Sequence, residues 1–115
     1  MAYIKRYCGR YMYEVTGQYV KEYCGRYLFE YNNHIMKRYC GQNIYEFSGN
    51  YIKEYCGRYL LEFDGRYVKR YCGRYLYEVV DNRYIKEYCG QYLYEIDGYV
   101  SQTDLLAIIT MLFAD

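Results

Sequence analysis

The chain has no tryptophan and no proline, and it has only four phenylalanines and one histidine, His34. Without proline, every residue after the first can donate a backbone hydrogen bond within a strand or helix. The formal net charge is only +1, so no excess of positive charge favours a nucleic-acid ligand or a polybasic membrane anchor. The longest apolar run, near residues 105–114, is too short to span a bilayer.

The first residues, from Met1 to Arg6, contain no apolar core of a secretory signal. We therefore expect a cytoplasmic protein without a membrane partner. Thiols stay reduced in that compartment, so the six cysteines are expected to be free. In the fold predicted below, neighbouring cysteines lie roughly 9 to 10 Å apart, beyond the limit of about 7 Å between the Cα atoms of a disulfide.

Tyrosine is abundant, with 22 residues, and the tripeptide Tyr-Cys-Gly occurs six times. Its cysteines stand at positions 8, 24, 40, 56, 72 and 89, so the spacing is sixteen residues and, at the last step, seventeen. Recurrence at a fixed period indicates tandem copies of one small structural unit. We predict six β-hairpin repeats over residues 1–100 and a capping helix over residues 101–115.

A second turn signal, such as Thr16-Gly17, lies midway between the Cys-Gly pairs. Such dipeptides tolerate the positive φ angles of two-residue hairpin turns, and we expect Cys-Gly to form similar turns. Turns about every eight residues leave strands of about six residues. The predicted fold is mostly β, an antiparallel meander of about twelve strands, with Val80 as an extra residue in a bulge or a three-residue loop. Asn33 and Asn43 depart from the repeat.

The register of two-residue hairpins decides which side chains share a face, and one face would be a continuous apolar and aromatic row. An open sheet of twelve strands would be about 53 Å wide. A helix of about thirteen residues is only about 20 Å long and would leave most of that row uncovered. The sequence therefore predicts a homo-oligomer, with the first strand as an open edge that could also pair. The predicted contact residues are Ile4, Tyr13, Val20, Phe29, Met36, Tyr45, Ile52 and Leu61.

The opposite face would alternate lysines with apolar residues, flanked by tyrosine, arginine and glutamate, and can remain in water. Its tyrosines could stack on a sugar or contact another protein. The alternative is that tyrosine is simply a residue that pairs well across strands. The candidate interaction surface consists of Tyr3, Lys5, Tyr7, Tyr19, Lys21, Tyr23, Tyr51, Lys53, Tyr55, Tyr67, Lys69 and Tyr71.

The pattern changes at Ser101, where Ser101 and Asp104 have the spacing of a capping box at a helix start. Apolar residues then recur at helical spacing around a wide arc, so this helix must be buried. We expect it to pack on the apolar face of the last repeats. The residues expected in that contact are Leu105, Ile108, Ile109 and Leu112.

A β-solenoid with one coil per repeat is the alternative fold. It would stack six lysines directly on one another, and each neighbouring pair would cost about 0.9 kcal/mol in water. The alternating column that begins Arg6, Glu22, Arg38 argues for stacking, but the regular turns at the half-period favour the meander. In architecture, the predicted meander resembles the single-layer sheet of spirochaete outer surface protein A and the hairpins of MORN-repeat proteins.

No asymmetric set of nucleophile, base and orienting residue stands out, because each glutamate recurs once per repeat. The sequence contains no phosphate-binding glycine loop or metal-ligand spacing, so we expect no enzyme activity, cofactor or metal. We interpret the chain as a structural or protein-interaction module. A binding module for a carbohydrate or another extended ligand along the tyrosine, lysine and glutamate face is the alternative.

Overall fold

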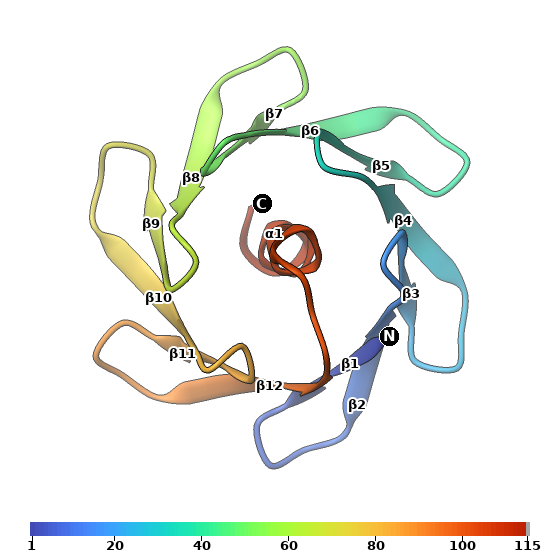
Figure 1. Ribbon diagram of the computed structural model, residues 1–115, viewed down its shortest axis with the longest axis vertical. Helices are drawn as coiled ribbons and strands as arrows, with labels where there is room; N and C mark the ends of the chain where they lie inside the picture. The colour runs from blue at the N-terminus through green and yellow to red at the C-terminus, as the bar shows by residue number, and fades with distance from the viewer. Residues whose placement is uncertain (115) are drawn as a thin grey trace.

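The computed structural model describes residues 1–114, which form twelve β-strands followed by one α-helix (Figure 1). The strands have four to seven residues, and each repeat supplies two of them. The predicted mostly-β meander of hairpins with a C-terminal helix is confirmed. The elements are β1 (Ala2–Arg6), β2 (Tyr11–Val15), β3 (Tyr19–Glu22), β4 (Tyr27–Tyr31), β5 (Ile35–Arg38), β6 (Asn43–Ser48), β7 (Tyr51–Glu54), β8 (Tyr59–Phe63), β9 (Tyr67–Arg70), β10 (Tyr75–Val80), β11 (Tyr84–Glu87), β12 (Tyr92–Gly98) and α1 (Gln102–Phe113).

Neighbouring strands are antiparallel throughout the described chain, and consecutive strands are paired. A solenoid would instead pair equivalent strands of successive repeats in parallel. The solenoid alternative is therefore wrong. Cross-strand geometry also places each repeat lysine opposite or diagonal to a glutamate rather than on top of another lysine, which removes the repulsion that a solenoid would have to overcome.

The sheet closes into a barrel, because β1 pairs with β12 as well as with β2. The expected open single-layer sheet, with a free edge at β1, is therefore wrong. The molecule measures 37 × 34 × 21 Å, so its longest extent is shorter than the width of about 53 Å expected for the open sheet. Six regularly spaced register shifts, one in each Cys-Gly hairpin, explain the curvature, since bulges bend a strand and increase its twist.

The Cys-Gly hairpins differ from the expected two-residue turn. In the first, the Gly9 N–H donates to the Arg6 carbonyl at 2.8 Å, and the Arg6 N–H donates to the Arg10 carbonyl at 3.2 Å. Positive φ falls on Cys8, at 56°, and not on Gly9. This pattern is that of a type II turn with a cysteine at the position that normally takes glycine. All six cysteines adopt φ between 52° and 56°.

The glycine of this turn is required for space rather than for its φ. A Cβ atom built on Gly9 would lie 2.9 Å from the Cβ of Arg6, and the same clash recurs at 2.8 to 3.0 Å in the other five hairpins. The two residues of the turn therefore have separate roles: cysteine takes the left-handed backbone, and glycine allows the strands to approach closely. At the opposite end, Val80 pairs with Tyr84, which leaves residues 81–83 as the predicted three-residue loop.

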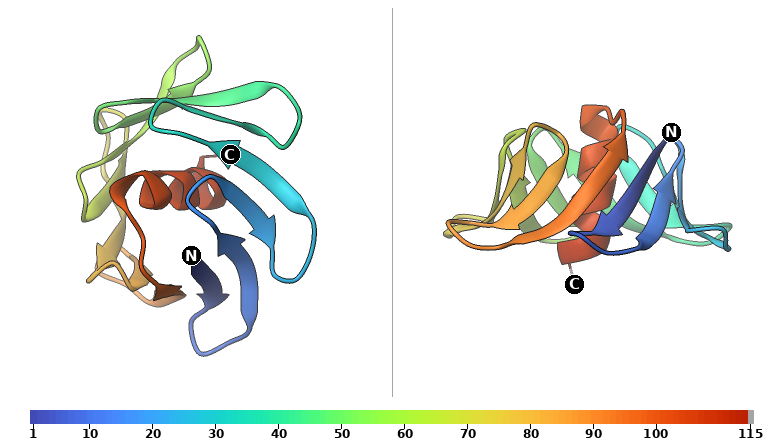
Figure 2. Two further views of the ribbon diagram at one scale, coloured as in Figure 1. Left: turned by 45° about the vertical axis from the view of Figure 1, so that its right-hand side comes forward. Right: turned by 90° about the horizontal axis from the view of Figure 1, so that it is seen from below.

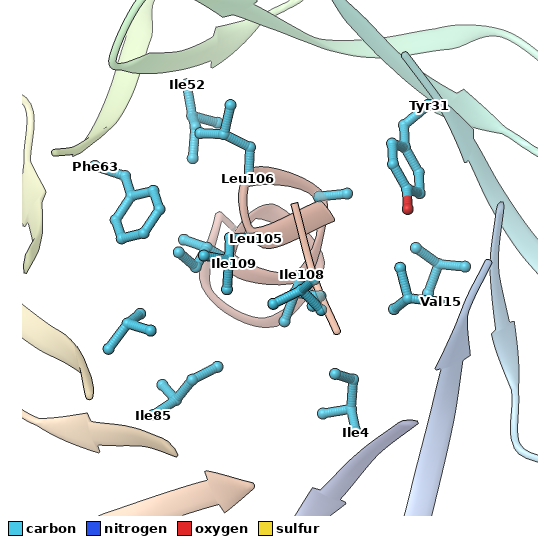
Figure 3. Packing of buried hydrophobic residues seen from close by; sticks show 14 of the residues in the cluster. Ile4, Val15, Tyr31, Ile52, Phe63, Ile85, Leu105, Leu106, Ile108 and Ile109 are labelled. Carbon is cyan, nitrogen blue, oxygen red and sulfur yellow. The ribbon is translucent and has the colours of Figure 1, made fainter. Parts of the chain in front are cut away.

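Helix α1 lies inside the barrel and runs through it (Figures 1 and 2). Leu105, Ile108 and Ile109 are almost completely buried, whereas Leu112 is only partly buried. The helix faces strands all around the ring, and not only those of the last repeats (Figure 3). Barrel diameter grows with strand number, so a twelve-stranded ring needs more than its own side chains to fill it. The described chain has no helix with the length and apolar character needed to cross a bilayer.

The apolar row assigned to an oligomer contact points into the barrel. Its aliphatic members are at most 2% exposed, and its aromatic members pack against the same core. Closure and α1 cover the row within a single chain, so the prediction that these residues form a dimer face is wrong. The residues concerned are Ile4, Tyr13, Val20, Phe29, Met36, Tyr45, Ile52 and Leu61.

The start of α1 is fixed to the barrel by polar contacts. Ser101 and Asp104 form the predicted capping box, in which each side chain accepts the other residue's backbone N–H. The second oxygen of Asp104 accepts a buried hydrogen bond from the Tyr31 hydroxyl at 2.6 Å. Burial and this carboxylate raise the pKa of Tyr31 far above its ordinary value, so the phenol remains a donor. These contacts set the depth and rotation of the helix.

The two turn residues predict opposite mutational effects. Cys24→Asn should raise the free energy of unfolding by up to about 1 kcal/mol, because asparagine enters the left-handed region more readily. Gly25→Ala should lower it by about 1–3 kcal/mol, because the new Cβ would overlap Glu22. Urea denaturation of both variants tests the assignment. Destabilisation by Cys24→Asn together with tolerance of Gly25→Ala would show that the roles are reversed.

The buried helix predicts a large loss on truncation at its centre. Ile109→Ala should lower the free energy of unfolding by about 2–5 kcal/mol, because Ile109 is fully buried. Leu112→Ala should cost less because Leu112 is partly exposed. Gln102→Ala is the exposed control and should change stability by less than about 0.5 kcal/mol. A comparably small effect at Ile109 would contradict the helix-filled barrel.

Candidate functional site

The outer face carries a belt of tyrosine clusters, which we call the tyrosine belt. Each complete cluster combines the first tyrosine of two paired strands with the Tyr-Cys-Gly tyrosine of the next repeat around the ring, and its ring centroids are 4.8 to 6.0 Å apart. Tilted and edge-on contacts at this spacing are favourable. The clusters are Tyr3-Tyr11-Tyr23, Tyr19-Tyr27-Tyr39, Tyr51-Tyr59-Tyr71, Tyr67-Tyr75-Tyr88 and Tyr84-Tyr92-Tyr7.

A layer of lysine–glutamate pairs accompanies the belt. The lysine of every repeat lies 3.1 to 3.9 Å from a glutamate oxygen. In five repeats the ammonium group also lies 5.7 to 5.9 Å from the centroid of a belt tyrosine. Each repeated glutamate is therefore paired with a lysine.

Two of these glutamates also brace a Cys-Gly hairpin. Glu14 accepts the Cys24 backbone N–H at 3.0 Å and the Lys21 ammonium at 3.3 Å. Glu46 does the same with Cys56 and Lys53. The backbone N–H of the cysteine, supported by the lysine, lowers the pKa of Glu14 and Glu46 below the ordinary value. These carboxylates therefore remain ionised at neutral pH and accept hydrogen bonds from groups within the barrel.

The predicted interaction residues lie on the outer face, but they do not form one continuous ladder. All of the tyrosines among them except Tyr55 belong to the belt, and they are distributed over its five clusters. The tyrosine of the second strand of every cluster was absent from the predicted residues, although the repeat register could have indicated it. Two of the apolar residues that were expected to alternate with the lysines on the outer face, Leu60 and Leu76, are partly buried and pack against the core. The cluster residues missed are Tyr11, Tyr27, Tyr39, Tyr59, Tyr75, Tyr84, Tyr88 and Tyr92.

One position of the belt is incomplete. Where the other clusters have two strand tyrosines, the third repeat has Ile35 and Asn43. The remaining member is Tyr55, which is 43% exposed and has no aromatic partner among the described residues. In the other repeats the lysine lies opposite a tyrosine on the neighbouring strand. Lys37 lies opposite Asn43 instead, so it has no ring to contact there. We call this position the belt gap.

The belt gap opens a cleft. A cavity of about 670 Å³ lies at this position. At the equivalent position two repeats further along, where Tyr67 and Tyr75 are present, the cavity has a volume of only about 130 Å³. A second cavity of about 660 Å³ is lined by Asn43 and Tyr55. The larger cavity therefore coincides with the two missing rings, and Ser101 and Thr103 at the start of α1 add to its lining. The residues that line the larger cavity are Gly17, Gln18, Glu30, Tyr31, Asn32, Asn33, Ile35, Lys37, Asn43, Ser101 and Thr103.

The charged pair in this cleft is the least tightly held of the six. Lys37 and Glu30 are 3.9 Å apart, and their side chains are 36% and 31% exposed. The corresponding values for Lys21 and Glu14 are 3.3 Å, 15% and 11%. Glu30 and Lys37 can therefore turn toward a bound molecule at small cost. Within residues 1–114, no three histidine, cysteine, aspartate or glutamate side chains are grouped to hold a metal ion.

The lowered pKa of Glu14 predicts a pH-dependent contribution to stability. A carboxylate whose folded pKa lies below its unfolded value stabilises the protein above the unfolded value, and this contribution disappears as the pH falls through the folded pKa. Glu14→Gln should cost about 1–3 kcal/mol at neutral pH. The difference from the original protein should shrink as the pH falls below about 4.3, the ordinary glutamate value. Chemical denaturation of Glu14→Gln across this range tests the trend, and Glu54→Gln, at a half-exposed glutamate, controls for the loss of one negative charge.

Comparison of the chain with protein-family models, with curated protein sequences and with solved structures found no match. The belt, its gap and the residues around them are therefore the features of the molecule that bear on its function.

Proposed function

We propose that the protein is a non-enzymatic binding module that takes a carbohydrate chain at the belt gap. The observation that carries the proposal is the contrast between equivalent positions: the cleft is large where two rings are absent and nearly closed where they are present. Its volume is within the range of pockets that bind small molecules. The site breaks the internal symmetry of the barrel, as a site for one ligand would.

The residues around the gap supply the groups that a sugar ring needs. The unpartnered, exposed ring of Tyr55 offers a flat face for the C–H side of a sugar. Asn43 and Gln18 carry amides that can both donate to and accept from hydroxyl groups. The Asn32 amide can donate, because its oxygen already accepts the backbone N–H groups of the turn. The loosely paired Glu30 and Lys37 add one acceptor and one donor. The mixture is close to charge-neutral, which favours a hydroxyl-rich ligand over a polyanion.

The non-enzymatic part of the proposal is supported by how the carboxylates are used. Glu14 and Glu46 are held by a lysine and a backbone N–H, and the other four repeat glutamates each have a basic partner. A general acid needs a proton at neutral pH, and the lowered pKa of Glu14 and Glu46 opposes this. A reducing, cytoplasmic location is part of the same proposal, supported by the free state of the cysteines.

A protein-interaction module is the second candidate. It is favoured by the many belt and hairpin tyrosines that remain 37% to 45% exposed, beside the arginines of the hairpins. Tyrosine and arginine are the residues that protein interfaces favour. This function would use the complete clusters around the ring, whereas a carbohydrate would use the gap, so the two candidates are separable by mutation.

The proposal predicts that filling the gap abolishes sugar binding. Ile35→Tyr combined with Asn43→Tyr restores the cluster found elsewhere, so the barrel should keep its stability. After a glycan array has identified an oligosaccharide, calorimetric titration should show binding weakened about tenfold or more by this variant, and by Tyr55→Ala.

The matched control is Tyr67→Ile combined with Tyr75→Asn, which opens the equivalent position in another repeat and should leave binding at the gap intact. Equal losses in the control and the filled variant would argue against the gap as the site. A silent glycan array, together with capture of a protein that is lost on mutation of Tyr23 or Tyr71, would favour the second candidate.

A further inference from the structure

Five positions of the repeat carry the same residue in all six copies, whereas the others vary. In the first repeat they are Lys5, Tyr7, Cys8, Gly9 and Glu14. The structure gives four of them a role in the fold. The lysine and glutamate form the ion-pair layer, the glycine avoids a clash, and the tyrosine completes a belt cluster in five of the six cases. The cysteine is the position that these roles leave unexplained.

Cysteine is a poor choice for this position on structural grounds. Its backbone is in the left-handed region in every hairpin, where glycine or asparagine has lower energy. The thiol is exposed and takes no part in the core. In five hairpins it lies beside the hydroxyl of the preceding tyrosine, and an asparagine or serine side chain could serve that contact equally well. Backbone strain repeated six times at an exposed reactive group points to a use for the thiol.

The fold spaces these thiols so that they cannot pair within one molecule. Successive Cys-Gly hairpins are two strands apart, which is roughly 9 to 10 Å within a sheet. The tips of these hairpins also point outward, away from the axis of the barrel (Figures 1 and 2). A disulfide requires Cα atoms within about 7 Å. The tips are unobstructed toward the outside, so a thiol of a second molecule can reach them.

We propose that the six hairpin cysteines, which we call the thiol crown, link copies of this chain through intermolecular disulfides when a peroxide is present. A thiolate of one copy attacks a peroxide oxygen, the O–O bond breaks, and the sulfur becomes a sulfenic acid while one water is released. A thiolate of a second copy then attacks that sulfur, the S–S bond forms as the S–O bond breaks, and the hydroxide takes up a proton and leaves as a second water. Two thiols are oxidised and one hydrogen peroxide is reduced to two waters.

The number and placement of the thiols give this reaction its outcome. A molecule with one reactive tip can form only a dimer, whereas six tips spread around a ring allow each copy to bind several neighbours. The crown therefore produces a branched assembly rather than a discrete dimer. Cysteine does not line either cavity at the belt gap, so the inference is independent of the carbohydrate proposal.

The test compares the full chain with two variants, each treated with stoichiometric hydrogen peroxide. One variant has asparagine at all six cysteine positions, and the other keeps only Cys24. Non-reducing electrophoresis and light scattering should show a ladder beyond the dimer for the original chain, a dimer at most for the Cys24-only variant, and monomer for the six-asparagine variant. Dithiothreitol should reverse every linkage, and circular dichroism should remain that of the folded barrel.

Alkylation of the original chain with iodoacetamide before peroxide is a second control that needs no variant, and it should also leave a monomer. The inference is overturned if intact mass shows disulfides within a monomer. It is equally overturned if the thiols gain oxygen without linking, if the original chain stops at a dimer, or if the blocked protein still assembles.

Discussion

A ring of twelve strands is wider than its own side chains can fill, and the placement of α1 inside it resolves this constraint. The helix supplies buried leucine and isoleucine side chains that meet the inward rows of strands from all six repeats. Its orientation is set by the contact between Tyr31 and Asp104 and by the capping box at Ser101. The barrel and the helix therefore depend on each other. Without α1 the ring would enclose a void, and without the ring the apolar run at residues 105–109 would be exposed.

Closure also makes the first and last repeats equivalent to the others. Strand β1 pairs with β12, Lys5 pairs with Glu95, and the Tyr7 ring completes a cluster with two rings of the last repeat. Because the ring has no ends, each position has five counterparts with the same strand neighbours. Departures from the repeat then have visible structural consequences, and the pair at Ile35 and Asn43 is the departure that opens a cleft.

The candidate site was only partly accessible from the sequence. The outward tyrosines and lysines could be placed on one face because strands alternate their side chains. The grouping of the tyrosines in threes could not, because each cluster joins residues from adjacent repeats across a register shift. Asn43 was visible as a departure from the repeat, but its importance depends on the rings that surround the equivalent positions elsewhere.

The sequence by itself determined the number and type of elements, because hydrophobic period and turn spacing act locally along the chain. It determined the helix start at Ser101 for the same reason. Only the tertiary structure decided that the sheet closes, that α1 lies within it, and that the row from Ile4 to Leu61 is interior rather than a contact between molecules. Closure depends on the summed twist and bulges of twelve strands, a long-range quantity that no single repeat contains.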